Sequence, residues 1–186
     1  MFPNEKADIQ LKMKHLLYEA IHIRIVRMSK PQLRLIADSC EELLYYNEAN
    51  NYWKKCFKKK FDLPEIEAEY RRRYAQFLYQ ILDYKEGNAQ FINALSLKGK
   101  NDGQKYINIC TYQAWINCIF RSENNRSFDK NIVDKNSLDI RHLYTKALDA
   151  ADSIERFDLQ KSAEGILDEI RRLFESSRHT KLEPVI

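Results

Sequence analysis

Histidines and carboxylates are among the side chains most often used in catalysis and metal binding, and their spacing in this sequence favours neither. His15 and His22 lie seven residues apart on one predicted helix, but no cysteine or aspartate stands beside them to complete a zinc site. Asp139 and His142 have the spacing of one helical turn, yet no serine or cysteine nucleophile accompanies them. We therefore expect no metal site and no catalytic residues.

Motifs that bind phosphate or zinc through a fixed spacing are also missing from the sequence. It contains no GxGxxG, no GxxxxGK[ST] and no HExxH. The glycines of the first two motifs let the backbone approach a phosphate, and the two histidines of the third share one metal ion. We predict that the protein is not an enzyme and needs no small-molecule cofactor.

One pair of residues nevertheless has a spacing known from catalysis. Arg172 and His179 bound the segment RLFESSRH, an R-x6-H pattern that resembles the ribonuclease signature of the helical HEPN families. The resemblance covers two residues and implies that an arginine and an imidazole meet the scissile phosphate in a dimer cleft. A HEPN-like ribonuclease is therefore one alternative to the prediction of a non-enzyme.

A basic stretch is the most distinctive chemical feature of the sequence. Residues 54–73 hold eight cations and four acids, so this segment carries the entire net charge of +4 of the chain. Such a local excess attracts acidic proteins or phosphate groups. The residues that we predict to contact a partner are Lys54, Lys55, Lys58, Lys59, Arg71, Arg72 and Arg73.

The rings in this stretch help to distinguish between the kinds of partner. On a helical wheel the four lysines lie on one side, and the apolar residues Trp53, Cys56, Phe57 and Phe61 lie on the other. Rings that stack on nucleic-acid bases must be exposed beside the cations. The pattern favours an acidic protein partner over a nucleic acid, and a solvated helix face without a partner is the simplest explanation of all.

Residues 31–82 are similar to the F-box-like segment of the Elongin A family. PQLRLIADSCEELL is followed by the basic run YWKKCFKKKF and then by the aromatic-rich EYRRRYAQFLYQIL. The resemblance implies a substrate-adaptor module of a cullin ubiquitin ligase that docks through elongin C. Ile36, Cys40 and Leu44 have the spacing of the BC box of that family, which places three side chains in one groove of the partner.

Length and composition bound the class of protein. At 186 residues the chain is long enough to bury a sizeable core. Four glycines and four prolines are too few for the turns of an all-β fold. A charged N-terminus without a long apolar run predicts a soluble protein with no signal peptide and no membrane partner. Four cysteines without a CxxC motif predict reduced thiols in the cytoplasm or the nucleus.

Apolar residues recur at helical spacing along most of the chain. They predict an all-α fold, a multi-helix bundle or helical array of about six to seven helices, with Trp53 and Trp115 inside it. Whether residues 33–61 form one helix or two is open, and we find no repeat period. The expected capping residues, which accept the first N–H groups of a helix, are Ser29, Asp62, Ser137 and Asp158.

Prolines, glycines and the apolar spacing predict the limits of the helices and of the domain. A helix that starts near Pro64 is expected to continue until Gly87, and another helix is expected over residues 6–28. We predict a single domain of residues 1–186, with a subdivision near 98–105 or 122–136 as an alternative. As a function we predict a helical protein–protein interaction adaptor or regulatory protein; the oligomeric state and the identity of the partner stay open.

Overall fold

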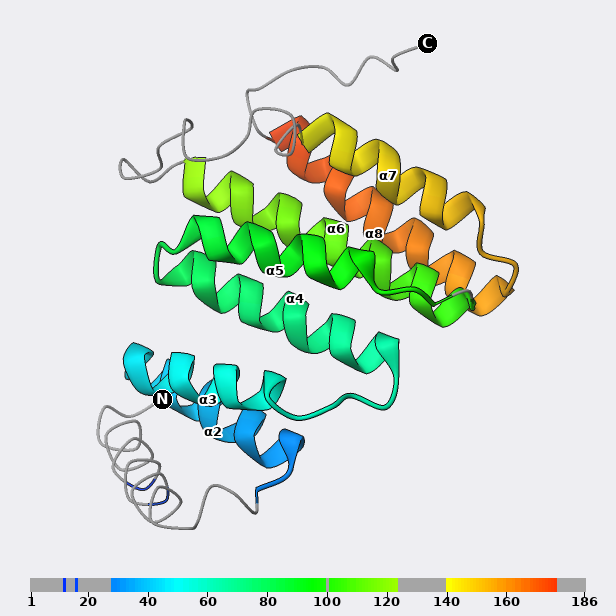
Figure 1. The fold of residues 1–186 in the computed structure, drawn as a ribbon. Coiled ribbons are helices and arrows are strands. Elements are labelled where there is room, and N and C mark those ends of the chain that lie inside the picture. Colours follow the sequence, from blue (N-terminus) through cyan, green and yellow to red (C-terminus); the bar gives the residue numbers. More distant parts are fainter. Residues whose placement is uncertain (1–11, 13–15, 17–27, 100, 124–139, 177–186) are drawn as a thin grey trace. The chain divides into compact units, whose positions relative to one another are not determined.

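The computed structural model describes residues 12, 16, 28–99, 101–123 and 140–176. Seven helices and no strand make up the regular structure of these residues, which confirms the predicted all-α fold (Figure 1). The chain divides into two compact units, Met1–Lys60 and Phe61–Ile186, called unit 1 and unit 2 below. The single domain stays a prediction. The helix expected over residues 6–28, the cap at Ser137 and the segment 122–136 lie wholly or largely outside the described residues.

Unit 1 contains a helical hairpin of α2 (Lys30–Glu42) and α3 (Tyr46–Phe57). The predicted start of α2 is confirmed: the Ser29 hydroxyl accepts from the backbone N–H of Gln32, and the Gln32 side chain accepts from the N–H of Ser29. This reciprocal capping box satisfies N–H groups that have no partner within the helix. The open question about residues 33–61 is answered, because the chain forms two helices here.

A left-handed leucine ends each of two helices. Leu44, with φ 63°, follows α2, and Leu82, with φ 66°, follows α4 (Pro64–Gln80). The N–H of the next residue bonds five positions back in both places, Tyr45 to the Cys40 carbonyl and Asp83 to the Leu78 carbonyl. This is the Schellman arrangement, in which glycine is the usual left-handed residue.

Five helices form unit 2. They are α4, α5 (Tyr84–Ser96), α6 (Asp102–Glu123), α7 (Ile140–Asp152) and α8 (Phe157–Ser176). Figure 1 shows α6 between the α4–α5 pair and the α7–α8 pair, and α6 packs on all four. Its Trp115 is buried, as expected, and stacks on Phe91 of α5 with ring centroids 5.4 Å apart. The segment around Trp115 is therefore the centre of this core.

A buried asparagine joins three helices of unit 2. The side-chain carbonyl of Asn88 on α5 accepts hydrogen bonds from the Tyr79 hydroxyl of α4 and from the Trp115 indole N–H of α6, the latter at 2.8 Å. Burial raises the pKa of Tyr79 well above its usual range, so the phenol keeps the proton that it donates. One acceptor thus satisfies two buried donors.

Three expected helix limits are wrong. The helix expected to reach Gly87 ends at Gln80, and Gly87 lies inside α5, whose true N-cap is Asp83. α4 begins after Leu63, which makes no side-chain cap, so Asp62 does not cap it. Asp158 is the second residue of α8 and not its cap; its carboxylate pairs with Arg156 at 2.8 Å.

The turns of the hairpins α2–α3 and α4–α5 have the same backbone arrangement 38 positions apart, as the paired leucines show. The stretch LLYYNEANNYW (43–53) corresponds to ILDYKEGNAQF (81–91), with leucine, tyrosine, glutamate and asparagine at matching places. Burial matches as well, because Trp53 and the equivalent Phe91 are both fully buried. No repeat was predicted from the sequence, since most of the pairs are similar in character and not identical.

All four cysteines are free thiols, and burial raises the pKa of Cys40 and of Cys56 to about 11. These two thiols therefore stay protonated at neutral pH, which makes them poor nucleophiles. None of the helices in the described part of the chain is long and apolar enough to cross a membrane.

Candidate partner-binding surface

The four predicted lysines lie at the C-terminal end of α3 in unit 1. Lys54 and Lys55 belong to the last turn, Lys58 is the capping residue, and Lys59 follows it. Lys54 and Lys58 are exposed, and Lys55 and Lys59 are half-buried. We call this group the lysine surface. Cations here oppose the negative end of the helix dipole, which favours lysine in the last turn.

The lysine surface is not neutralised by acidic groups of the described chain. None of its four residues takes part in an ion pair there. The ammonium of Lys55 lies 4.6 Å from the ring centroid of Tyr52, a cation–π contact that orients the side chain without removing its charge. Tyr52 was not among the residues predicted from the sequence, although its three-residue distance from Lys55 is the helical signal for such a contact.

The aromatic side of α3 points away from solvent, as the helical wheel predicts. Trp53 and Cys56 are fully buried, and Phe57 is half-buried. A stacking platform for bases needs exposed rings next to the cations. The lysine surface therefore offers charge alone.

The repeated hairpin shows that the fold does not require these lysines. The positions of α5 that correspond to Lys54, Lys55, Lys58 and Lys59 hold Ile92, Asn93, Ser96 and Leu97. The two hairpins share the left-handed leucine, the buried aromatic ring and a buried small side chain, Cys56 or Ala94. The turn and the buried positions of the hairpin thus do not require cations at the end of the second helix, although α5 continues one residue further than α3 and ends in extended backbone at Leu97.

The three predicted arginines belong to α4 of unit 2 and differ among themselves. Arg71 is held by its own unit: its guanidinium donates to a Glu67 carboxylate oxygen at 2.6 and 2.8 Å and to the Gln90 side chain at 2.9 Å. Gln90 lies on α5, so Arg71 links two helices. Arg72 and Arg73 are half-buried. The cations of the basic patch expected from the sequence thus belong to two units. The lysine surface has no ion pair in the described chain, whereas Arg71 is bonded to Glu67 and Gln90.

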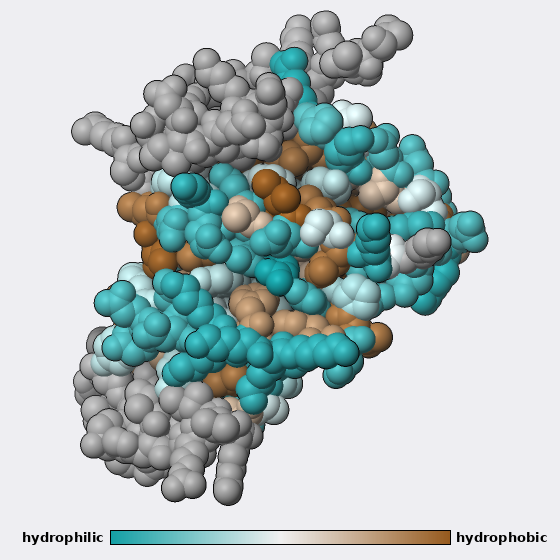
Figure 2. Space-filling model, viewed as in Figure 1, coloured by the Kyte–Doolittle hydropathy of each residue, from teal (hydrophilic) through white to brown (hydrophobic). Residues whose placement is uncertain are grey.

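Figure 2 shows how polar and apolar residues are distributed over one face of the molecule. On this face the described residues are mostly hydrophilic, and apolar residues lie in separate places among them. No group of three or more histidine, cysteine or acidic side chains that could hold a metal ion occurs in the part of the chain that the structure describes.

The residues of the BC-box resemblance do not share one helical ridge. Ile36 and Cys40 are buried on α2, whereas Leu44 lies beyond the end of that helix and is 66% exposed. The left-handed backbone at Leu44 turns the chain before the third position of the motif. The resemblance would place these three side chains in one groove of a partner. Two of them belong to a helix and the third follows it in left-handed backbone, so they do not form one helical row.

Of the residue pairs whose spacing could suit catalysis or metal binding, the structure describes at most one member each. Arg172 is exposed on α8, and His142 is exposed on α7. His179 and Asp139, their respective partners in the sequence, lie outside the described residues, as do His15 and His22. No family model, no curated protein and no solved structure matches the chain. The lysine surface therefore carries the functional argument without the support of relatives.

Proposed function

We propose that the chain is a helical protein-interaction module, an adaptor or regulator, that binds an acidic protein partner through the lysine surface. The observation that carries this proposal is the comparison of the two hairpins: α4–α5 has the same turn and the same buried positions but no lysine at the corresponding places. Four like charges also repel one another at close range, and an acidic partner removes that cost. Such a surface mainly raises the association rate and sets specificity.

The test replaces the charge and keeps the length of the side chains as far as that is feasible. The variant Lys54→Gln/Lys55→Gln/Lys58→Gln/Lys59→Gln should keep its helicity, because none of the four side chains is buried and substitutions at the surface change stability by only about 0.5 kcal/mol each. Binding of poly-L-glutamate, measured by fluorescence anisotropy at about 50 mM salt, should weaken roughly tenfold or more.

A matched control separates the lysine surface from general charge. Lys85, Lys98, Lys146 and Lys161 are exposed residues of unit 2, and their replacement by glutamine removes the same charge. This control should bind poly-L-glutamate like the wild type. Equal losses in both variants would contradict the proposal. Tighter binding of a single-stranded oligonucleotide than of poly-L-glutamate at about 200 mM salt would instead support the nucleic-acid alternative.

A further inference from the structure

Two connections in the chain contain the same kind of peptide bond, a basic residue followed by phenylalanine. Lys60–Phe61 joins the two units, and Arg156–Phe157 joins α7 to α8. The side chains are more exposed at Arg156–Phe157, because Phe157 is 78% exposed and Phe61 is half-buried. A protease, however, must draw several residues of backbone into an extended shape, so the backbone hydrogen bonds decide which bond it cuts.

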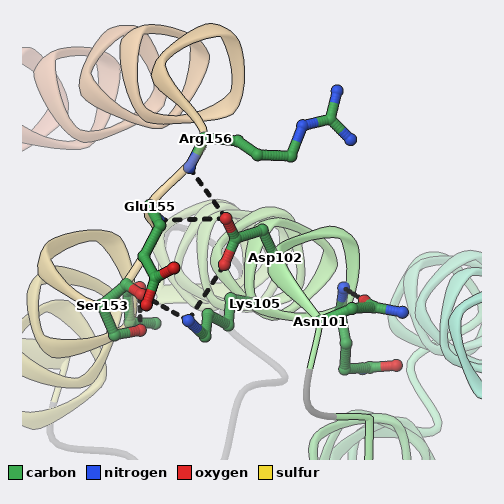
Figure 3. Close-up of polar contacts among 8 residues, drawn as sticks. Asn101, Asp102, Lys105, Ser153, Glu155 and Arg156 are labelled. Atoms are coloured by element: carbon green, nitrogen blue, oxygen red, sulfur yellow. Dashed lines mark hydrogen bonds and ion pairs between the residues drawn. The ribbon is translucent and has the colours of Figure 1, made fainter.

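The backbone around Arg156–Phe157 is held in place by α6. The carboxylate of Asp102 accepts from the backbone N–H groups of Glu155 and Arg156, at 3.0 and 2.8 Å (Figure 3). Lys105 lies 3.0 Å from the same carboxylate and also donates to the Ser153 carbonyl. Ile154, in the middle of this connection, is buried. Opening this loop therefore breaks several contacts at once.

The carbonyl of the Arg156–Phe157 bond is also engaged, since it accepts from the Gln160 N–H at 2.9 Å in the first turn of α8. Figure 3 shows the Arg156 side chain turned away from Asp102. Arg156 is therefore exposed through its side chain, while its backbone N–H is bonded to Asp102. The pKa of Asp102 is lowered mainly by the hydrogen bond from Lys105 and next by the bond from the Arg156 backbone. The Asp102 carboxylate is therefore ionised at neutral pH.

The backbone of the connection around Lys60–Phe61 makes longer hydrogen bonds, although the Phe61 ring packs edge-on against Tyr70 with ring centroids 5.3 Å apart. Residues 58–63 belong to no helix, and the backbone bonds of Lys58 and Lys59 to α3 are long, at 3.3 Å each. The carbonyl of Lys60 accepts from the Lys30 ammonium, which is a flexible side-chain donor. Lys58, Lys60 and Asp62 are exposed. This connection therefore opens at a lower cost than the α7–α8 connection.

We propose that the Lys60–Phe61 bond is a site of limited proteolysis for a serine endoprotease that is specific for basic residues. Water adds across the amide: the C–N bond breaks, Lys60 gains a carboxylate and Phe61 gains an ammonium group. The cut breaks the covalent connection between unit 1, which carries the lysine surface, and unit 2. The hydrophobic core that runs from Ala75 to Phe174 lies wholly within unit 2 and stays on one side of the cut. The proposal stands whether or not the lysine surface binds an acidic protein.

The test compares the two bonds in the intact full-length chain. Trypsin at a low ratio to substrate should cut after Lys60 about tenfold faster than after Arg156, as followed by mass spectrometry of the new termini. Thermolysin, which cuts on the amino side of large apolar residues, should prefer Lys60–Phe61 over Arg156–Phe157 in the same way. Phe-Asp-Leu follows both bonds, so the residues on the carboxyl side of the cut do not account for a difference in rate.

Two variants give the controls. Lys58→Gln/Lys59→Gln/Lys60→Gln should abolish the trypsin cut at the junction and leave the thermolysin cut in place. Asp102→Ala should speed cleavage of Arg156–Phe157 and leave the Lys60–Phe61 rate unchanged. Equal or faster cleavage of Arg156–Phe157 in the wild type would overturn the proposal. Loss of the thermolysin cut in the triple variant would also overturn it, since the bond would then depend on the lysines themselves.

Discussion

At Gly87 the packing of α4 on α5 leaves no room for a methyl group. A Cβ at this position would lie 2.7 Å from Cδ2 of Tyr79 and 3.4 Å from the Ala75 carbonyl oxygen. The Tyr79 ring cannot retreat easily, because it is buried and its hydroxyl is bonded to Asn88. A residue that resembles a helix stop in the sequence is thus a residue of close helix–helix contact.

We expect Gly87→Ala to lower the free energy of unfolding by roughly 1 kcal/mol, because overpacking exceeds the gain in helix propensity. Urea denaturation followed by circular dichroism measures this change. Gly165→Ala is the matched control, since nothing lies within 4 Å of a Cβ there. It should raise stability by about 0.5–1 kcal/mol. A rise of similar size in both variants would show that Tyr79 gives way.

At the scale of elements, the ends of α2 and α4 explain why the helix limits were hard to predict. The starts of helices carry side-chain signals: Ser29 with Gln32 was identified, and Asp83 with Glu86 was present but overlooked. The Schellman ends at Leu44 and Leu82 lack the glycine that marks such an end in a sequence. Their leucines resemble two more positions of an apolar stripe, so the helical pattern in the sequence continues past the end of the helix.

The left-handed backbone at Leu44 and Leu82 lowers the stability of the folded chain by an amount that can be measured. Leu44→Gly should be more stable than Leu44→Ala by about 1 kcal/mol, and the same order should hold at Leu82, because alanine in a left-handed conformation is strained. Comparison with alanine removes the contribution of the leucine side chain. Lys161 is exposed inside α8, and there the alanine variant should be more stable than the glycine variant by about 1 kcal/mol. Thermal unfolding of the six variants decides.

At the scale of the whole molecule, composition and periodicity were sufficient for the fold class and for the burial of Trp53 and Trp115. They were not sufficient for the division at Lys60 and Phe61, because the apolar spacing runs across it from Trp53 to Phe61 and into α4. The cations of the predicted basic patch belong to both units, and the single patch stays a prediction. Linear spacing reports which face of a helix a residue occupies, and not which unit that helix belongs to.

The division into units predicts two unfolding transitions, which the tryptophans can report separately. Trp53 belongs to unit 1 and Trp115 to unit 2. In urea, fluorescence of Trp53 in a Trp115→Phe variant should change at a lower midpoint than fluorescence of Trp115 in a Trp53→Phe variant, because the smaller unit buries less surface. Circular dichroism of the wild type should span both transitions. A single shared midpoint for all three signals would support the single domain that the sequence predicts.

The short turns of the two hairpins also bear on how quickly the chain folds. Three residues connect α2 to α3, and three connect α4 to α5, so each pair of helices is joined by contacts that are near in sequence. Local contacts of this kind form fast, since little loop entropy is lost before they stabilise the chain. We therefore predict that the α4–α5 hairpin, with Asn88 and Gly87 at its interface, forms early in the folding of unit 2. Glycine in place of Leu82 should accelerate refolding more than it slows unfolding.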